Sequence, residues 1–361
     1  MMMRTFRLHM HFTTPAFMGN AEQSAQWRAP PIKALLRQWW RVAYAADKGF
    51  AVSVDKMRQE EGLLFGHAWL ENDTFERAGK QIKTAARKSQ IRIRLDRWNE
   101  GKLKQSDWPH LDHVNHPEVG RLIASDLYLG FGPVTLPKGA SHPTLKAHAA
   151  LQAGEAAQIS IAVPDQSAAL IQRALWLMDR YGTLGGRSRN GWGSFTLTSH
   201  DGEPPLSGKS PERPWRQALD SDWPHAIGCD DTGPLIWQTR PHAPDDWKSL
   251  MKTLAEIKIG LRRQFRFTTG MDAERPEDRH WLSYPVTHHS VRSWGNNARL
   301  PNTLRFKVRK IADDQLVGVI FHVPHLPPAA FSPDKRAIET VWMQVHRFLD
   351  FPAQKLGRIS E

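Results

Sequence analysis

The residues of this chain best suited to bind a charged ligand form a glycine-rich stretch over residues 182–195. Two arginines in it stand among small, polar and aromatic residues, the candidate contacts being Gly185, Gly186, Arg187, Ser188, Arg189, Asn190, Gly191 and Trp192. Glycine lets the backbone approach a ligand closely, and arginine donates paired hydrogen bonds to phosphate oxygens. The arginines and the glycine amides therefore suit a polyanion, and Trp192 would either stack on a base or anchor the next strand in the core.

A nucleotide-binding phosphate loop is the first alternative for this stretch, and its surroundings argue against it. Such a loop ends in Lys followed by Ser or Thr, where a helix begins and turns its positive end to the phosphates. Here the apolar positions from Leu170 to Tyr181 predict a helix that ends at Gly182, before the stretch, and residues 192–198 predict a strand after it. The negative, C-terminal end of the helix would therefore face the anionic ligand. The alternative without a ligand is a glycine-rich connection with arginines in solvent.

Further cations are predicted on two helices. Over residues 32–46, apolar residues at helical spacing indicate a core-facing side, and Lys33, Arg37 and Arg41 form a basic ridge on its flank, which Arg28 extends. The ridge is either a solvated face or part of a phosphate track. Arginines 262, 263 and 266 close a helix predicted from residue 247, where they either complement its negative end or contact RNA.

The composition indicates a globular protein with an acidic partner. Of the 361 residues, 40% are apolar and 24% charged, and 49 Lys and Arg against 37 Asp and Glu leave a net charge of +12. Nucleic acid is the first candidate partner and an anionic membrane the second. No apolar run approaches the ~20 residues that span a bilayer, so we expect a cytoplasmic protein without a membrane partner. Cys229 is the only cysteine, which excludes intrachain disulfides and cysteine-cluster zinc sites.

The order of predicted elements indicates an α+β fold made twice. The first half combines the helices predicted over residues 32–46 and 170–181 with strands over residues 4–12, 91–97, 123–131, 155–163 and 192–198. Residues 63–66 suit a short strand or turn. The second half repeats the pattern, with strands near residues 235–239, 304–309 and 316–323. Four antiparallel strands covered by two helices make a ferredoxin-like domain, whose RRM form binds RNA on the open sheet face. We expect two ferredoxin-like (RRM-like) domains with inserted loops, over residues 1–203 and 215–361, joined by a linker over 204–214.

Two motifs of the first half are similar to those of one known family. The stretch over residues 182–195 resembles the C-terminal glycine-rich motif of the RAMP superfamily of CRISPR-associated proteins. The run from Pro30 to Arg41, with its Trp39-Trp40 pair, resembles subunit one of the Cmr module, the type III-B effector complex. The resemblance implies an RNA-binding subunit that holds the 3′ region of the guide RNA, its target, or both, beside other Cmr subunits in antiviral defence, without a cofactor or metal.

The resemblance also bears on catalysis. In the family, target cleavage belongs to a backbone subunit with an aspartate in the loop after its first strand. The corresponding loop here, residues 13–29, contains Glu22 and no aspartate. We therefore predict no nuclease activity and no catalytic residue.

Three alternatives remain. An endonuclease of the same superfamily could process precursor guide RNA without metal, using His9, His11, Tyr44 or Lys33 as acid and base. A zinc site could form at His110, Asp112, His113 and His116, although Pro109 and Pro117 disfavour helical presentation. A mainly structural capping subunit could use the 15 tryptophans at protein interfaces.

Overall fold

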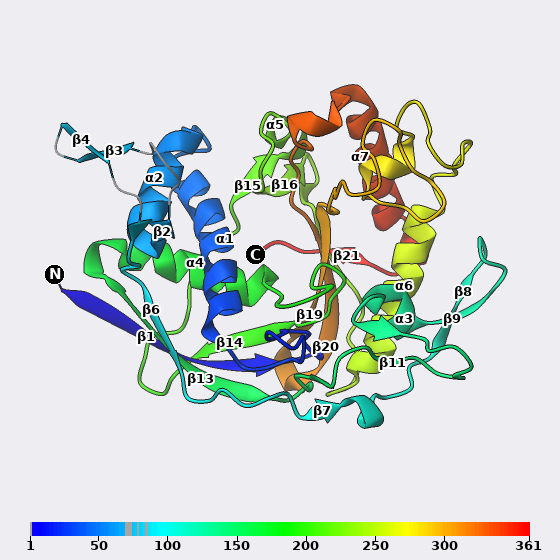
Figure 1. Ribbon diagram of the computed structural model, residues 1–361, viewed down its shortest axis with the longest axis horizontal. Helices are drawn as coiled ribbons and strands as arrows, with labels where there is room; N and C mark the ends of the chain where they lie inside the picture. The colour runs from blue at the N-terminus through cyan, green and yellow to red at the C-terminus, as the bar shows by residue number, and fades with distance from the viewer. Residues whose placement is uncertain (1, 69–73, 78, 84–85) are drawn as a thin grey trace.

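Two four-stranded antiparallel sheets, each with its own helices, make up the mixed α/β fold (Figure 1). The computed structural model describes residues 2–68, 74–77, 79–83 and 86–361.

The first sheet has the strand order β14-β1-β13-β6. Its elements follow one another as β1 (Met3–Phe12), α1 (Ala29–Asp47), β6 (Arg92–Leu95), β13 (Ala156–Pro164), α4 (Ala168–Tyr181) and β14 (Phe195–Ser199). Alternate residues of β1, such as Leu8, Met10 and Phe12, are buried in the same core as the apolar stripes of α1 and α4. The period-two and helical patterns of the sequence therefore place the helices on the buried face of the sheet.

The second sheet has the strand order β19-β20-β18-β21. Its elements are β18 (Ile236–Gln238), α6 (Trp247–Arg262), β19 (Leu304–Lys310), β20 (Leu316–His322), α7 (Lys335–Asp350) and β21 (Gly357–Arg358). Asp246 caps α6 by accepting a hydrogen bond from the Ser249 amide at 3.2 Å, and Asp334 caps α7 in the same way. Both halves therefore follow the order strand, helix, strand, strand, helix, strand.

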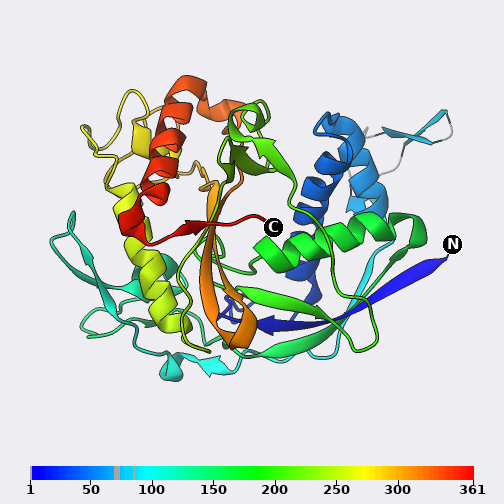
Figure 2. The same ribbon diagram turned by 180° about the vertical axis from the view of Figure 1, so that it is seen from behind.

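The remaining elements are insertions and short pairs around the two sheets. They comprise α2 (Val54–Phe65), β2 (His67–Ala68), β3 (Thr74–Arg77), β4 (Lys80–Lys83), β5 (Ala86–Arg87), β7 (Leu103–Lys104), β8 (His113–His116), β9 (Arg121–Ala124), α3 (Ser125–Gly130), β10 (Val134–Thr135), β11 (Thr144–Leu145), β12 (Ala149–Ala150), β15 (Glu212–Pro214), α5 (Trp215–Ala218), β16 (Ile227–Asp230) and β17 (Gly233–Pro234). Within the segment predicted as a linker, β15 pairs in parallel with β16. The first sheet with α1 and α4 lies on the left of Figure 1 and α6 and α7 lie on the right, where β8, β9 and α3 of the first half extend beside α6; Figure 2 shows the same arrangement from behind.

The two halves share hydrogen bonds and a continuous core. The Phe306 amide on β19 donates to the Arg189 carbonyl at 3.0 Å, and the Val308 amide donates to Ser194 Oγ at 2.9 Å. The fully buried Lys307 donates through Nζ to the Asp179 carbonyl at 2.5 Å, at the end of α4. The glycine-rich stretch therefore lies at the junction between the halves.

Three local predictions were wrong. Residues 123–131 form the end of β9 and the short helix α3 instead of one strand, and residues 63–65 end α2. The alternation of cations with apolar residues along β19 predicts an open, RNA-binding sheet face, but Arg305, Lys307 and Arg309 are all buried. Tertiary packing against the first half overrides the amphipathic pattern of that strand. No helix among the described ranges is long and apolar enough to cross a membrane.

Candidate nucleic-acid interface

The glycine-rich stretch packs its backbone against the loop that follows β1. The Gly186 amide donates to the Phe17 carbonyl at 3.0 Å and the Gly191 amide donates to the Ser188 carbonyl at 3.2 Å. A Cβ on Gly185, which has a φ of +90°, would lie 2.6 Å from the Phe17 carbonyl oxygen. The glycines thus permit close packing within the protein. The Gly186 and Gly191 amides therefore already have carbonyl partners, and the contact of these glycines with a ligand stays a prediction.

Trp192 belongs to the core. Its side chain is fully buried, and its ring centroid lies 5.2 Å from that of Phe17, 5.7 Å from that of Trp108 and 6.0 Å from that of Trp247. The structure therefore supports the core alternative for Trp192, and its indole presents no face to a base. Phe131 is instead exposed: its relative accessibility is 64%, and its carbonyl accepts a hydrogen bond from Arg187 Nε.

The sequence did not single out Phe131, which was assigned to the end of a strand. The sequence signal that could have identified it is the turn-forming run Phe131-Gly132-Pro133. It follows α3 and leaves an aromatic residue outside any regular element.

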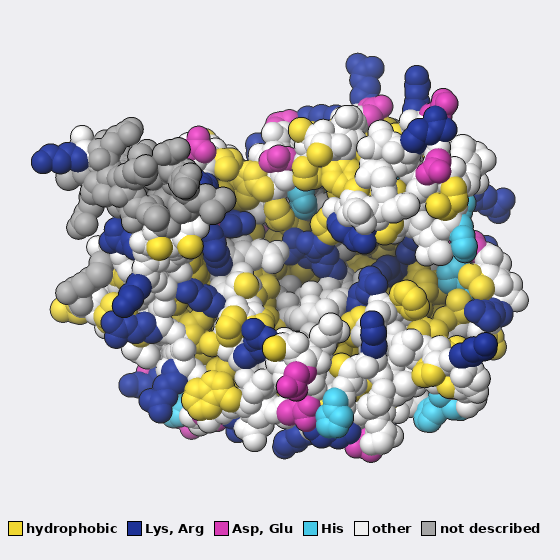
Figure 3. Space-filling view, in the orientation of Figure 1, with side chains coloured by type: hydrophobic (Ala, Val, Ile, Leu, Met, Phe, Trp, Pro, Cys, Tyr) yellow, Lys and Arg dark blue, Asp and Glu magenta, His cyan; other side chains and the backbone are white. Residues whose placement is uncertain are grey.

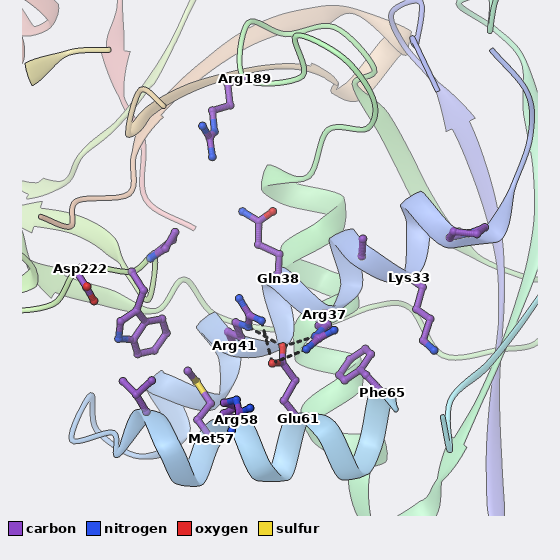
Figure 4. A pocket seen from close by; sticks show the side chains of 15 residues that line it. Lys33, Arg37, Gln38, Arg41, Met57, Arg58, Glu61, Phe65, Arg189 and Asp222 are labelled. Atoms are coloured by element: carbon purple, nitrogen blue, oxygen red, sulfur yellow. Dashed lines mark hydrogen bonds and ion pairs between the residues drawn. The ribbon is translucent and has the colours of Figure 1, made fainter. Parts of the chain in front are cut away.

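The basic ridge of α1 faces Arg189 across one cavity (Figure 4). This α1 cavity has a volume of about 780 Å³, and Lys33, Arg37, Arg41 and Arg189 all contribute to its wall. Gln38 and Arg189 point toward one another from α1 and the glycine-rich stretch. The structure therefore brings the two predicted groups of cations together. Arg28 does not line this cavity; its guanidinium donates to the Gly19 carbonyl at 2.7 Å.

Glu61 on α2 partly neutralises the ridge. Its buried carboxylate pairs with Arg37 Nε at 2.8 Å and with Arg41 Nε at 2.6 Å (Figure 4). Burial by itself would raise the pKa of Glu61, but hydrogen bonds from the two arginines outweigh burial and lower it. Sequence reasoning missed this residue. A helical reading of residues 54–65 would have found it, because Glu61 follows Met57 by four positions on the buried side.

A second, central cavity of about 700 Å³ continues from the first, because Gln38 and Arg189 line both. Its described lining residues include no Asp or Glu but include the cations Arg187, Arg189, Lys258, Arg262, Arg299 and Arg305. Lys and Arg side chains gather around the middle of this face of the molecule (Figure 3). Such a wall attracts anions over a distance and cannot neutralise its own charge.

The charges of the central cavity disturb one another. Burial, Arg262 and Arg187 lower the pKa of Lys258 to about 7, although Lys258 Nζ donates a hydrogen bond to Asn190 Oδ1 at 2.5 Å. Burial and the neighbouring Arg189 lower the pKa of Arg305 to about 9. Burial also lowers the pKa of Arg189 itself. A bound phosphate would relieve this repulsion. No sequence motif marks Lys258 for this role, because it reaches the cavity through the packing of the second half against the first.

The residues of the endonuclease alternative and of the zinc alternative do not converge. Lys33 lines the α1 cavity, whereas His9, His11 and Tyr44 do not, and the His9 ring stacks on His200 at 5.1 Å. His113 and His116 lie three positions apart on β8, where His113 is exposed and His116 is buried, so they point to opposite sides. Geometry thus favours neither an acid–base set around Lys33 nor a zinc site on β8.

Comparison with known proteins gives one family. The sequence model of the RAMP superfamily matches residues 9–196, just over half of the chain. No curated protein matches the sequence.

Several solved structures are similar. The crystal structure of Cmr1 from Pyrococcus furiosus in its apo form is 15% identical, with a TM-score of 0.44 and 96% of each chain covered. A chain in a type III-B Cmr-beta structure bound to cognate target RNA is 13% identical, with a TM-score of 0.43, 95% of this chain and 99% of that chain covered. A chain of a type IV-B CRISPR complex is 12% identical, with a TM-score of 0.31, 56% of this chain and 93% of that chain covered.

Proposed function

The chain belongs to the RAMP superfamily, and we propose that it is an RNA-binding subunit of a type III-B CRISPR (Cmr) effector complex. In this role it holds the 3′ region of the guide RNA, its target, or both, beside other Cmr subunits in antiviral defence. The observation that carries the proposal is the junction of the α1 cavity and the central cavity at Arg189. The two motifs that resemble the family supply the two sides of that junction.

The chemistry of the walls favours a nucleic-acid backbone as ligand. Phosphates supply regularly spaced negative charges, which complement the cations of the central cavity that have no carboxylate partner among the described residues, and arginine binds phosphate through paired donors. Cavities of about 780 and 700 Å³ are of the size that small ligands fill, so they suit a few nucleotides of extended single strand. Phe131 at the rim offers a face on which one base can stack.

We also infer that each half is a ferredoxin-like domain. The order β14-β1-β13-β6 and the order β19-β20-β18-β21 both become 4-1-3-2 when the strands of each half are numbered along the chain. The RNA then lies between the two domains, on α1 and the glycine-rich stretch, and does not use the exposed face of the first sheet.

Fluorescence anisotropy with labelled single-stranded RNA at several salt concentrations tests the proposal. We expect R187A/R189A to weaken binding and to make the salt dependence shallower by about 1.4 in the logarithmic slope, since each lost phosphate contact contributes ~0.7. The control R336A/R347A removes the same charge from exposed positions on α7. Equal losses in both variants, or none in either, would refute the assignment.

The proposed role is binding without cleavage. Incubation of the purified chain with CRISPR repeat RNA in EDTA distinguishes it from the endonuclease alternative, because metal-free processing would yield discrete products. Failure to bind RNA even at low salt would instead favour the structural capping role.

A further inference from the structure

A third cavity lies next to the C-terminal end of α6. It has a volume of about 900 Å³ and is bounded by the turn between β8 and β9 and by residues 286–289. We call it the arginine cavity, after Arg262, Arg263, Arg266 and Arg279 in its wall. Arg262 and Thr287 also line the central cavity, so the two spaces meet at these residues.

The arginine cavity keeps an excess of positive charge. Arg279 is paired with Glu118 through two hydrogen bonds of 2.6 and 3.0 Å, which compensate one cation. Burial alone would raise the pKa of Glu118, but the Arg279 contact outweighs it and lowers the pKa, so Glu118 is a carboxylate. Arg262, Arg263 and Arg266 form no ion pair with a carboxylate in the described part of the chain. Three cations therefore remain uncompensated.

Two polar side chains in the wall are buried with nitrogens that lack partners. Arg279 is 8% exposed and His116 is 9% exposed, and neither Arg279 Nε nor His116 Nδ1 has a hydrogen-bond partner among the described residues. An unmet buried polar group costs about 1–3 kcal/mol. A ligand with several acceptor oxygens in the cavity would satisfy the guanidinium donor.

The helix dipole does not account for this cluster. Arg262 and Arg263 stand at the C-terminal end of α6, where a cation is favourable. The dipole amounts to about half an elementary charge and acts only within the last turn, so it cannot balance three cations. Arg266 and Arg279 lie beyond that turn, on the loop after α6 and on the segment 278–281.

We propose that the arginine cavity is a second phosphate-binding site, which takes the continuation of the single strand that occupies the central cavity. The inference rests on the proposed function. The strand passes over Arg262, the side chain common to both cavities, and its next phosphates meet Arg263 and Arg266 at the surface and Arg279 inside. A free nucleotide offers the same phosphate chemistry, and the experiment separates the two sources.

The test is RNA binding by the full chain as a function of RNA length. R263A/R266A removes two exposed cations that form no ion pair among the described residues, and R336A/R347A is the control of equal charge. Wild-type affinity should rise with length beyond the few nucleotides that fill the α1 and central cavities. R263A/R266A should remove that rise, with about a tenfold loss for a long strand and a salt slope shallower by about 1.4, and should leave the shortest strands almost unaffected.

Three results would overturn the inference. The first is an unchanged length dependence in R263A/R266A, with RNA binding intact. This result refutes the second site but agrees with the proposed function. The second is binding of nucleoside monophosphate that R263A/R266A abolishes while long RNA is unaffected, which assigns the cavity to a free nucleotide. The third is a wild-type chain that binds no RNA at low salt, since this removes the proposed function on which the inference depends.

Discussion

Lys258 should make RNA binding depend on pH between pH 7 and 8, below the pKa of about 9 that burial and Arg189 give to Arg305 in the same cavity. Its pKa is lowered to about 7 by burial and by Arg262 and Arg187, so about half of the free molecules carry a neutral amine at pH 7. A phosphate bound in the central cavity would neutralise those neighbouring charges and restore the cation. Binding is therefore accompanied by proton uptake, and affinity falls as pH rises above 7.

The magnitude follows from the fraction of Lys258 that is protonated in the free protein. That fraction falls from about one half at pH 7 to about one tenth at pH 8, while the bound form stays protonated. We expect the association constant to fall about fivefold between pH 7 and 8, and about tenfold more between pH 8 and 9 while the bound form stays protonated. Histidines whose pKa is lowered by burial, such as His116 and His280, are already neutral across this interval.

Titration calorimetry of single-stranded RNA in buffers of different ionisation enthalpy measures both the affinity and the proton uptake. K258R keeps the charge across this range and should bind with nearly flat pH dependence between pH 7 and 8, below the pKa of Arg305. K258M should bind about as weakly at pH 7 as the wild type does at pH 9. A wild-type affinity that is constant from pH 7 to 9, or a K258R variant as pH-dependent as the wild type, would show that Lys258 is not at the phosphate site.

Other predictions separate ligand contacts from packing. F131A should weaken RNA binding by about 1–3 kcal/mol without lowering the melting temperature, since it removes only a stacking face; unchanged anisotropy titrations would contradict this. W192A should lower the free energy of unfolding by about 3–5 kcal/mol in urea, and a loss below 1 kcal/mol would mean that the indole is not in the core. E61Q should strengthen RNA binding at low salt by releasing Arg37 and Arg41 from their ion pairs. It should lower the free energy of unfolding by only about 1–2 kcal/mol, because both arginines are partly exposed to solvent. G193A should unfold at lower urea than wild type, because a Cβ there would lie 1.8 Å from the Leu184 carbonyl oxygen; an unchanged midpoint would refute the close approach.

The sequence predicted best the elements whose own periodicity determines their burial. The strand over residues 4–12 and the helices α1 and α4 were confirmed within a few residues, because each has one continuous apolar face. Residues 123–131 failed for the opposite reason: their apolar residues have no regular period, and tertiary contacts decide their conformation. Asp126 shows this, since it is buried and accepts a hydrogen bond from Trp108 Nε1 at 2.7 Å.

Only part of the candidate site could be predicted from the sequence, for a similar reason. Arg189 and the α1 ridge could be proposed from spacing within one segment. Lys258 could not, because it reaches the central cavity through the packing of the second half against the first, and the same packing places Arg305 in a cavity wall instead of on an open sheet face. Phosphate-binding chemistry is therefore readable locally, whereas the uncompensated charge of the cavity is a property of the assembled fold.

The bond between the Phe306 amide and the Arg189 carbonyl has a consequence for the kinetics of binding. Because the backbone of Arg189 is hydrogen-bonded to β19, and the neighbouring Lys307 is hydrogen-bonded to the end of α4, the backbone that carries the guanidinium has a fixed place in the free protein. Little backbone entropy then remains to be lost when RNA arrives. Association should accordingly be a single fast phase whose rate falls with salt, with no slow step that reports closure of the two halves around the strand.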